Sequence, residues 1–123
     1  TKDRDISYAG CGLPYYVGGL IENREELIVN TPAKYAGLTG VEVKTGKEAI
    51  ALCADKKEVI VKDVETGAEE AYGYDKLVLT VGASPAKLPI EGTDLSGVFQ
   101  MRTPDDAENI RSYVEENQVK KQL

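Results

Sequence analysis

The sequence contains no histidine and no tryptophan, and its 123 residues include only two cysteines, Cys11 and Cys53. These thiols stand far apart and outside any CxxC motif. Neighbouring residues therefore cannot build a zinc site or a dithiol redox pair, and two thiols do not make a disulfide scaffold. We expect no metal site. We expect Cys53 to be structural, because it lies in a strand pattern without charged or glycine neighbours.

Positive charge is also scarce, because 15 Lys and Arg residues stand against 21 Asp and Glu residues, for a net charge of −6. Nucleic acid is therefore not an expected partner. No apolar run approaches the roughly 18 residues of a membrane span, and the chain does not open like a signal peptide. We accordingly expect no membrane contact and a cytoplasmic location. A composition of 41% apolar and 29% charged residues is typical of a globular chain with its own core.

The stretch SYAGCGLPYYVGG, residues 7–19, places Cys11 between Gly10 and Gly12, with Pro14 just beyond. Proline is tolerated in the first turn of a helix, so this spacing predicts that Cys11 lies at or just before a helix N-terminus. Unpaired N–H groups there would stabilise a thiolate, and the small neighbours would let a ligand approach the sulfur. The alternative is a glycine-rich turn with a packed, unreactive thiol.

Two further helices have clear start signals. Thr31 followed by Pro32 predicts an N-cap and a first helical residue, and the glycines that follow predict a short helix. Thr103 followed by Pro104 and two acidic residues predicts a second helix, which has an apolar face and reaches about Asn117.

Between these helices the pattern favours strands. Val41 and Val43 alternate with polar residues and predict a short strand, and residues 48–74 predict a three-stranded antiparallel meander with one solvated face. The continuous run Leu77–Val81 predicts a strand covered on both faces in a parallel sheet, ending in a glycine turn. The fold class is therefore α/β. A glycine turn at the end of such a strand is also where open α/β sheets bind ligands.

The stretch around Cys11 resembles the active-site segment of the coenzyme A-disulfide reductases. These are the single-cysteine branch of the flavin-dependent pyridine nucleotide-disulfide oxidoreductases. One position departs from the pattern, because these reductases often have Asn where this chain has Gly10, which puts a side-chain contact to the substrate thiol in doubt. The matching residues are Ser7, Cys11, Gly12, Leu13, Pro14, Tyr15 and Tyr16.

A second stretch, YDKLVLTVGASP, resembles the second flavin-contacting motif of the same superfamily, through Tyr74, Asp75, Thr80, Gly82 and Pro85. In such flavoproteins, the strand after the active-site segment presents backbone groups to the adenine of FAD. Val43 occupies that place here, and a simple core valine is the alternative.

The resemblance implies a partial FAD-binding Rossmann-like domain. Residues 1–102 would form the latter part of this domain, and residues 103–123 a helix leading to a missing NAD(P)-binding domain. Neither of the two GxGxxG fingerprints that such a reductase needs for FAD and NAD(P)H occurs in the sequence. We therefore expect a fragment of a longer protein, inactive when isolated and without retained FAD.

By the same resemblance, the parent would be an NAD(P)H-driven FAD enzyme, a homodimer in which Cys11 reduces coenzyme A disulfide or a related disulfide or polysulfide. Ser7 and Tyr15 would bind the substrate thiol. The FAD-lining residues would be Pro14, Val43, Thr80, Val81 and Gly82. An NADH oxidase or peroxidase, whose cysteine cycles through a sulfenic acid, is one alternative. A non-catalytic β-rich interaction domain is another.

Overall fold

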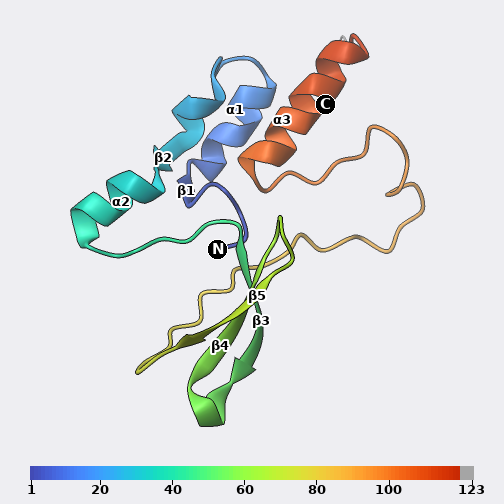
Figure 1. The fold of residues 1–123 in the computed structure, drawn as a ribbon. Coiled ribbons are helices and arrows are strands. Elements are labelled where there is room, and N and C mark those ends of the chain that lie inside the picture. Colours follow the sequence, from blue (N-terminus) through green and yellow to red (C-terminus); the bar gives the residue numbers. More distant parts are fainter. Residues whose placement is uncertain (120–123) are drawn as a thin grey trace. The chain divides into compact units, whose positions relative to one another are not determined.

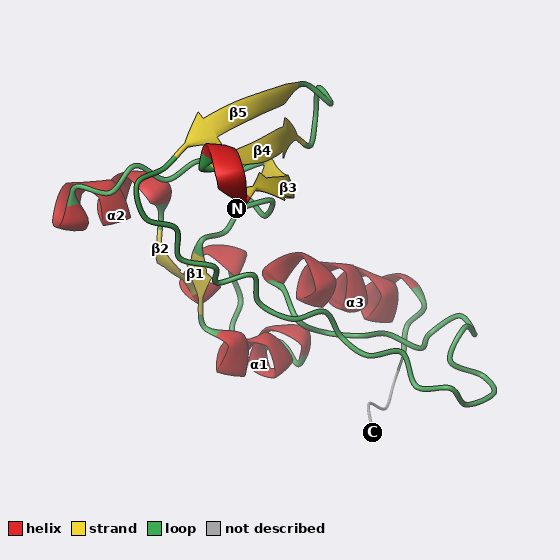
Figure 2. Ribbon diagram, turned by 90° about the horizontal axis from the view of Figure 1, so that it is seen from below, coloured by secondary structure: helices red, strands yellow, loops and turns green. Residues whose placement is uncertain are grey.

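The computed structural model describes residues 1–119, and its chain forms two compact units. The first unit comprises residues 1–7 and 30–81, and the second comprises residues 8–29 together with the chain from residue 82 onward. Two short strands, β1 (Ser7–Tyr8) and β2 (Ile28–Asn30), pair in a two-stranded sheet. Figure 2 distinguishes the helices, strands and loops of both units.

The first unit is built on an antiparallel sheet in the order β3-β4-β5, with β3 at Lys47–Cys53, β4 at Glu58–Asp63 and β5 at Glu69–Gly73. This confirms the meander that was predicted for residues 48–74. The register of β3 against β4 shifts between Ala49 and Ala51, so β3 carries one extra residue there.

The second hairpin turn is shaped by Asp63, whose Oδ1 accepts hydrogen bonds from the backbone N–H groups of Glu65 and Thr66 at 3.0 and 2.8 Å. Its Oδ2 accepts from Lys47 Nζ at 2.7 Å across the sheet. The Lys47 hydrogen bond, followed by the donors of Thr66, holds the pKa of the Asp63 carboxyl well below its usual range. One ionised side chain thus stabilises both the turn and the strand pairing.

Helix α2 (Pro32–Thr39) starts where its cap residues predict. The Oγ1 of Thr31 accepts from Lys34 N at 3.3 Å, and Gly40 ends the helix with a left-handed φ of 71°. The strand predicted at Val41 and Val43 is wrong, because residues 41–45 have no ladder partner and form an irregular link instead. Alternation alone does not make a strand when nothing pairs with it.

The second unit packs helix α1 (Leu13–Val17) against helix α3 (Pro104–Glu116), and Figures 1 and 2 show them side by side. The predicted N-cap of α3 is confirmed: Thr103 Oγ1 accepts from Asp106 N at 3.2 Å, and Asp106 Oδ2 accepts from Thr103 N at 2.8 Å. The buried residues of this small core are Leu13, Tyr16, Leu27 and Ala107.

The strand predicted at Leu77–Val81 is also wrong for this structure, in which the segment is irregular and exposed. Val78 is 81% exposed and Val81 is 88% exposed. A parallel strand needs a neighbouring strand to pair with and other elements, usually helices, to cover its faces, and no strand of residues 1–119 pairs with this segment. The parallel part of the predicted sheet is therefore not observed.

Candidate functional site

Cys11 lies in a 3-10 turn, Gly10–Gly12, that leads directly into α1, and its side chain is exposed. Two backbone hydrogen bonds fix the turn: Gly12 N donates to Ala9 O at 2.8 Å, and Ala9 N donates to Leu27 O at 2.8 Å. The expected position of Cys11 just before a helix is confirmed. The alternative of a thiol packed within the core is not what the structure shows.

The turn sits close against the core through Gly12, which is buried. A Cβ atom on Gly12 would lie 2.9 Å from Leu27 Cδ2, closer than ordinary van der Waals contact allows. At Gly10, by contrast, an added Cβ would meet nothing within 4 Å. The thiol is therefore held between one tightly packed glycine and one open glycine.

The two tyrosines that follow Cys11 have different environments. Tyr15 is 56% exposed, whereas Tyr16 is buried at 7% as part of the core. Pro14 is the second residue of α1 and is exposed. Tyr15 and Pro14 are thus available on the surface of the segment that carries Cys11, while Tyr16 supports it from inside.

Arg111 of α3, which no sequence pattern singled out, contacts the end of this segment. Its Nη1 donates to the carbonyl oxygens of Glu22 at 3.0 Å, Ile21 at 3.2 Å and Tyr16 at 3.5 Å. Its guanidinium carbon lies 4.7 Å from the centroid of the Tyr16 ring, a cation–π distance. An arginine that bonds to main-chain carbonyls far away in sequence leaves no local signature, so only the fold could reveal it.

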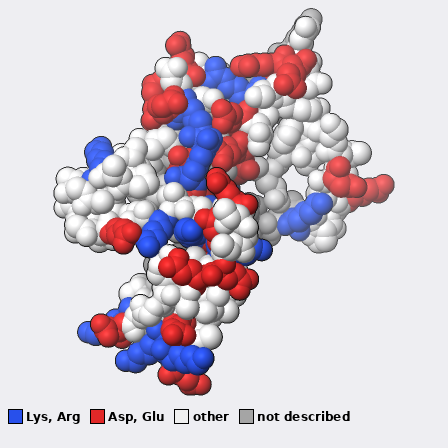
Figure 3. Space-filling view, in the orientation of Figure 1, with Lys and Arg blue, Asp and Glu red and all other residues white. Residues whose placement is uncertain are grey.

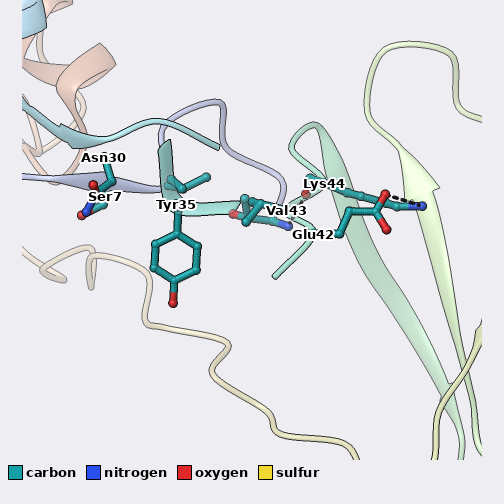
Figure 4. Close-up of a pocket in the computed structure, with 8 residues that line it drawn as sticks. Ser7, Asn30, Tyr35, Glu42, Val43 and Lys44 are labelled. Carbon is teal, nitrogen blue, oxygen red and sulfur yellow. Dashed lines mark hydrogen bonds and ion pairs between the residues drawn. The ribbon is translucent and has the colours of Figure 1, made fainter. Parts of the chain in front are cut away.

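A pocket of about 450 Å³ lies in the first unit, and it brings together Ser7 and Val43, two of the residues singled out from the sequence. Asn30, Tyr35 and Lys44, which Figure 4 also labels, line the same pocket. This volume falls within the range of small-molecule sites, and its lining mixes apolar surface with hydroxyl, amide and charged groups.

The charged rim of this pocket is organised by Lys44. Its Nζ lies 3.4 Å from Tyr72 Oη, 4.8 Å from the Tyr72 ring centroid and 3.6 Å from Glu42 Oε1. The hydrogen bond to Tyr72, reinforced by the charge of Glu42, raises the pKa of Lys44 above its ordinary value. Lys44 therefore stays a cation at neutral pH.

The other residues assigned to FAD do not gather around that pocket. Thr80 and Val81 line a separate depression of about 510 Å³ in the first unit, together with Leu77–Leu79. Gly82 belongs to the second unit and has a left-handed φ of 69°, which favours glycine. Pro14 also belongs to the second unit.

The Val43 pocket combines apolar surface with hydrogen-bonding and charged groups, a mixture that suits the adenosine half of FAD. Thr80 and Val81, being exposed and without ladder partners, leave their backbone groups accessible rather than enclosing a ring system. The fit is therefore partial, strongest at the adenosine end.

The visible face carries charges of both signs. Figure 3 shows acidic and basic side chains interspersed on the visible face. Within residues 1–119, no helix has the length and apolar character needed to cross a membrane. Among the same residues, no three His, Cys, Asp or Glu side chains cluster in a way that could hold a metal ion.

Comparison with known families gives one match over almost the whole chain. The model of the pyridine nucleotide-disulphide oxidoreductase family matches residues 1–121.

Individual relatives point the same way. The chain is 39% identical over 122 residues to an NADH oxidase of Methanocaldococcus jannaschii, covering 98% of this chain and 27% of the relative. It is 38% identical over 122 residues to a coenzyme A disulfide reductase of Staphylococcus aureus, covering 99% and 27%. Among solved structures, reduced CoADR-RHD of Bacillus anthracis matches with a TM-score of 0.88 and 30% identity, over 95% of this chain and 21% of that one. The chain thus spans about a quarter of the length of these curated relatives.

Proposed function

Because the chain belongs to the pyridine nucleotide-disulphide oxidoreductase family, we propose that it supplies the redox cysteine of an FAD-dependent, NAD(P)H-driven disulfide reductase. The substrate class is coenzyme A disulfide or a related low-molecular-weight disulfide or polysulfide. The single observation that carries this proposal is the exposed Cys11 on its tightly packed turn, in a chain that is similar to a coenzyme A disulfide reductase.

Cys11 is the proposed catalytic residue. Its thiolate attacks one sulfur of the substrate disulfide, a new Cys11–substrate disulfide forms, and the other half of the substrate leaves as a thiolate. Two electrons and one proton, together the equivalent of the hydride that NAD(P)H gives up, then cleave this mixed disulfide, releasing the second substrate thiol and restoring the Cys11 thiolate. Exposure of the sulfur matters for both steps, because in-line attack requires open access to it.

The proposed cofactor contacts follow the chain's own surfaces. Val43 would contact the adenosine half of FAD, and Pro14, Thr80, Val81 and Gly82 are the residues proposed to line the flavin. When bound, FAD would take a hydride from NAD(P)H and supply the two electrons that the disulfide consumes. Ser7 and Tyr15 would orient the substrate thiol.

The proposal extends to the organisation of the whole protein. Residues 1–102 would be the latter part of an FAD domain, and α3 would lead from it to an NAD(P)-binding domain in a homodimeric parent. Helix α3 occupies Pro104–Glu116 within the segment assigned to this link, whose last residues, 120–123, lie outside the described part of the chain.

A second candidate function is an NADH oxidase or peroxidase, which is favoured by the similarity to the M. jannaschii NADH oxidase. Here the Cys11 thiolate attacks one oxygen of hydrogen peroxide, forming a sulfenic acid and releasing hydroxide. Two electrons and one proton, the equivalent of a hydride from NADH, then convert the sulfenic acid back to the Cys11 thiolate and release water.

The test uses the full-length protein, its C11S variant and C53S as the matched cysteine control. NADH and NADPH consumption is followed with coenzyme A disulfide, with hydrogen peroxide and with oxygen. Turnover of the disulfide that is lost in C11S and kept in C53S supports the reductase. Turnover of peroxide or oxygen alone, with the same dependence on Cys11, supports the second candidate. Unchanged turnover in C11S would refute both.

A further inference from the structure

We propose that Arg111 is a positioning residue for Cys11: it clamps the end of the Cys11 segment to α3 through main-chain carbonyls. The proposal rests on the proposed function, in that Cys11 is taken as the reactive thiol. The clamp itself consists of contacts within the second unit, and its test reads those contacts without any enzymatic turnover.

The Cys11 segment needs outside support because its own helix is short. Helix α1 has five residues, whereas isolated helices shorter than about 12 residues are marginal in water. Its geometry must therefore come from tertiary contacts. The packing of Leu13 and Tyr16 in the core is one such contact, and the hydrogen bond from Ala9 to Leu27 is another.

Arg111 adds the contact that closes the other end. After α1, the chain turns through residues 18–21, where the N–H of Leu20 donates to Tyr15 O at 2.9 Å and that of Gly19 to Tyr16 O at 3.1 Å. The carbonyl oxygens of Ile21, the last residue of this turn, and of Glu22, the residue after it, accept hydrogen bonds from Arg111. Charge-assisted hydrogen bonds of this kind are stronger than neutral ones.

The side chain of Arg111 is well placed to act as a clamp rather than as a loose surface cation. It is 25% exposed, its planar group stacks on the buried Tyr16, and its Nε is paired with Glu115 at 3.1 Å on its own helix. A second arginine, Arg24, ties the same stretch to the first turns of α3 through Asp105 at 2.6 Å and Glu108 at 3.4 Å. Two arginines thus connect residues 16–24, which follow Cys11, to α3.

The test compares three substitutions in this chain. R111M removes the donors but keeps most of the stem, R111K keeps a cationic donor, and E115A removes only the exposed partner on α3. All are made with C53S, so that Cys11 is the sole thiol. Two quantities are measured: amide hydrogen exchange of residues 16–22, with the β3–β4 amides as the internal reference, and the rate constant of Cys11 with the neutral disulfide 4,4′-dithiodipyridine.

We expect R111M to accelerate exchange at residues 18–21 at least tenfold and to slow the reaction of Cys11 at least threefold. The thiol should react more slowly because, on a looser turn, its sulfur spends less time oriented for in-line attack on the disulfide. R111K should recover both values to within about threefold, and E115A should leave both within twofold.

The proposal would be overturned if hydrogen exchange at residues 18–21 is not accelerated in R111M, or if E115A and R111M have equal effects. Faster exchange with an unchanged or faster reaction of Cys11 would overturn it too. Equal acceleration over all of α3 and residues 8–29 would show general destabilisation and would also overturn it. If R111M does not fold, R111K against E115A still decides: a lysine cannot reach all three carbonyls, so R111K should exchange at residues 18–21 two- to threefold faster than the parent chain while E115A should not, and equal values in the two variants would overturn the proposal. Failure of the proposed function would appear elsewhere, as turnover that survives C11S in the full-length protein.

Discussion

Replacing Gly12 with alanine tests how closely the Cys11 turn is packed on the core. The added Cβ would lie 2.9 Å from Leu27 Cδ2 and 3.3 Å from Ile21 Cδ1. Leu27 is 0% exposed, so its side chain cannot move away without displacing its neighbours. G12A should therefore push the turn away from the core.

The size of the effect follows from two opposing contributions. Overpacking a filled core costs about 1–3 kcal/mol. Gly12 has φ −80° and ψ −19°, a conformation that alanine adopts freely, and the stiffer unfolded chain returns about 0.4–1 kcal/mol. The net loss of unfolding free energy should be up to about 2.6 kcal/mol, with a central value of about 1.3 kcal/mol. G10A is the matched control, because a Cβ there meets nothing within 4 Å, and it should be neutral or slightly stabilising.

Hydrogen exchange of the α1 and α3 amides measures the free energy of opening the second unit, with the β3–β5 amides as reference. L27A alone should cost about 2–5 kcal/mol, because it leaves a cavity. In the L27A background, the cost of G12A should vanish, since the cavity admits the new methyl group. Equal opening free energies in G12A and G10A would refute the packing argument, and so would a G12A cost that persists in L27A.

Four further outcomes are expected. T103A should lower the unfolding free energy by about 1 kcal/mol in urea titrations, because it removes the hydroxyl that accepts from Asp106 N at the start of α3. T103A should also speed hydrogen exchange in α3, and the control T66A, in a turn of the other unit, should not. At Asp106, burial acts to raise the pKa of the carboxyl, but the N–H donors of Thr103 and Arg102 outweigh it and leave the pKa lowered. This carboxylate therefore stabilises the fold at pH values above the pKa of the unfolded chain, about 4. The stabilisation is lost as the pH falls through the lowered pKa of the folded chain. Unfolding titrations of D106N from pH 7 to 2 should therefore show a shallower acid dependence than those of the parent chain, and identical slopes would contradict this assignment. The chain purified with added FAD should elute without flavin absorbance, because its sequence lacks the GxGxxG cradle, and a yellow fraction would contradict that expectation. The exposed apolar run at residues 77–81 should promote self-association at high concentration. In light-scattering measurements, V78K should reduce this self-association, whereas K76E, beside the run, should not. A parent chain that stays monomeric would count against the prediction.

The parts of the fold that follow from local chemistry could be predicted from the sequence. Both helix starts are marked by a Thr-Pro pair, Thr31-Pro32 and Thr103-Pro104. The threonine hydroxyl suits the N-cap, and proline, which has no N–H, suits the first helical position; α2 and α3 begin there. The meander was predictable because β-branched runs separated by turn residues pair with their own neighbours.

The parts that depend on distant partners could not be predicted in the same way. The run Leu77–Val81 has the composition of a covered strand, but composition cannot state which strands lie beside it, and none does among residues 1–119. At the candidate site, the position of Cys11 before α1 was readable from Pro14 and the glycines. The role of Arg111 was not, because its acceptors are backbone carbonyls and no residue type at those positions signals the contact.

The extra residue in β3 decides which charges face each other across the sheet. With it, Lys47 lies opposite Asp63 and Glu48 lies opposite Lys62, two attractive pairs. If the ladder continued without interruption from the Cys53–Glu58 pair, Glu48 would instead confront Asp63, and two carboxylates would repel at the hairpin end. The irregularity in the ladder therefore lets a strand with one residue too many keep opposite charges facing each other at this end of the sheet.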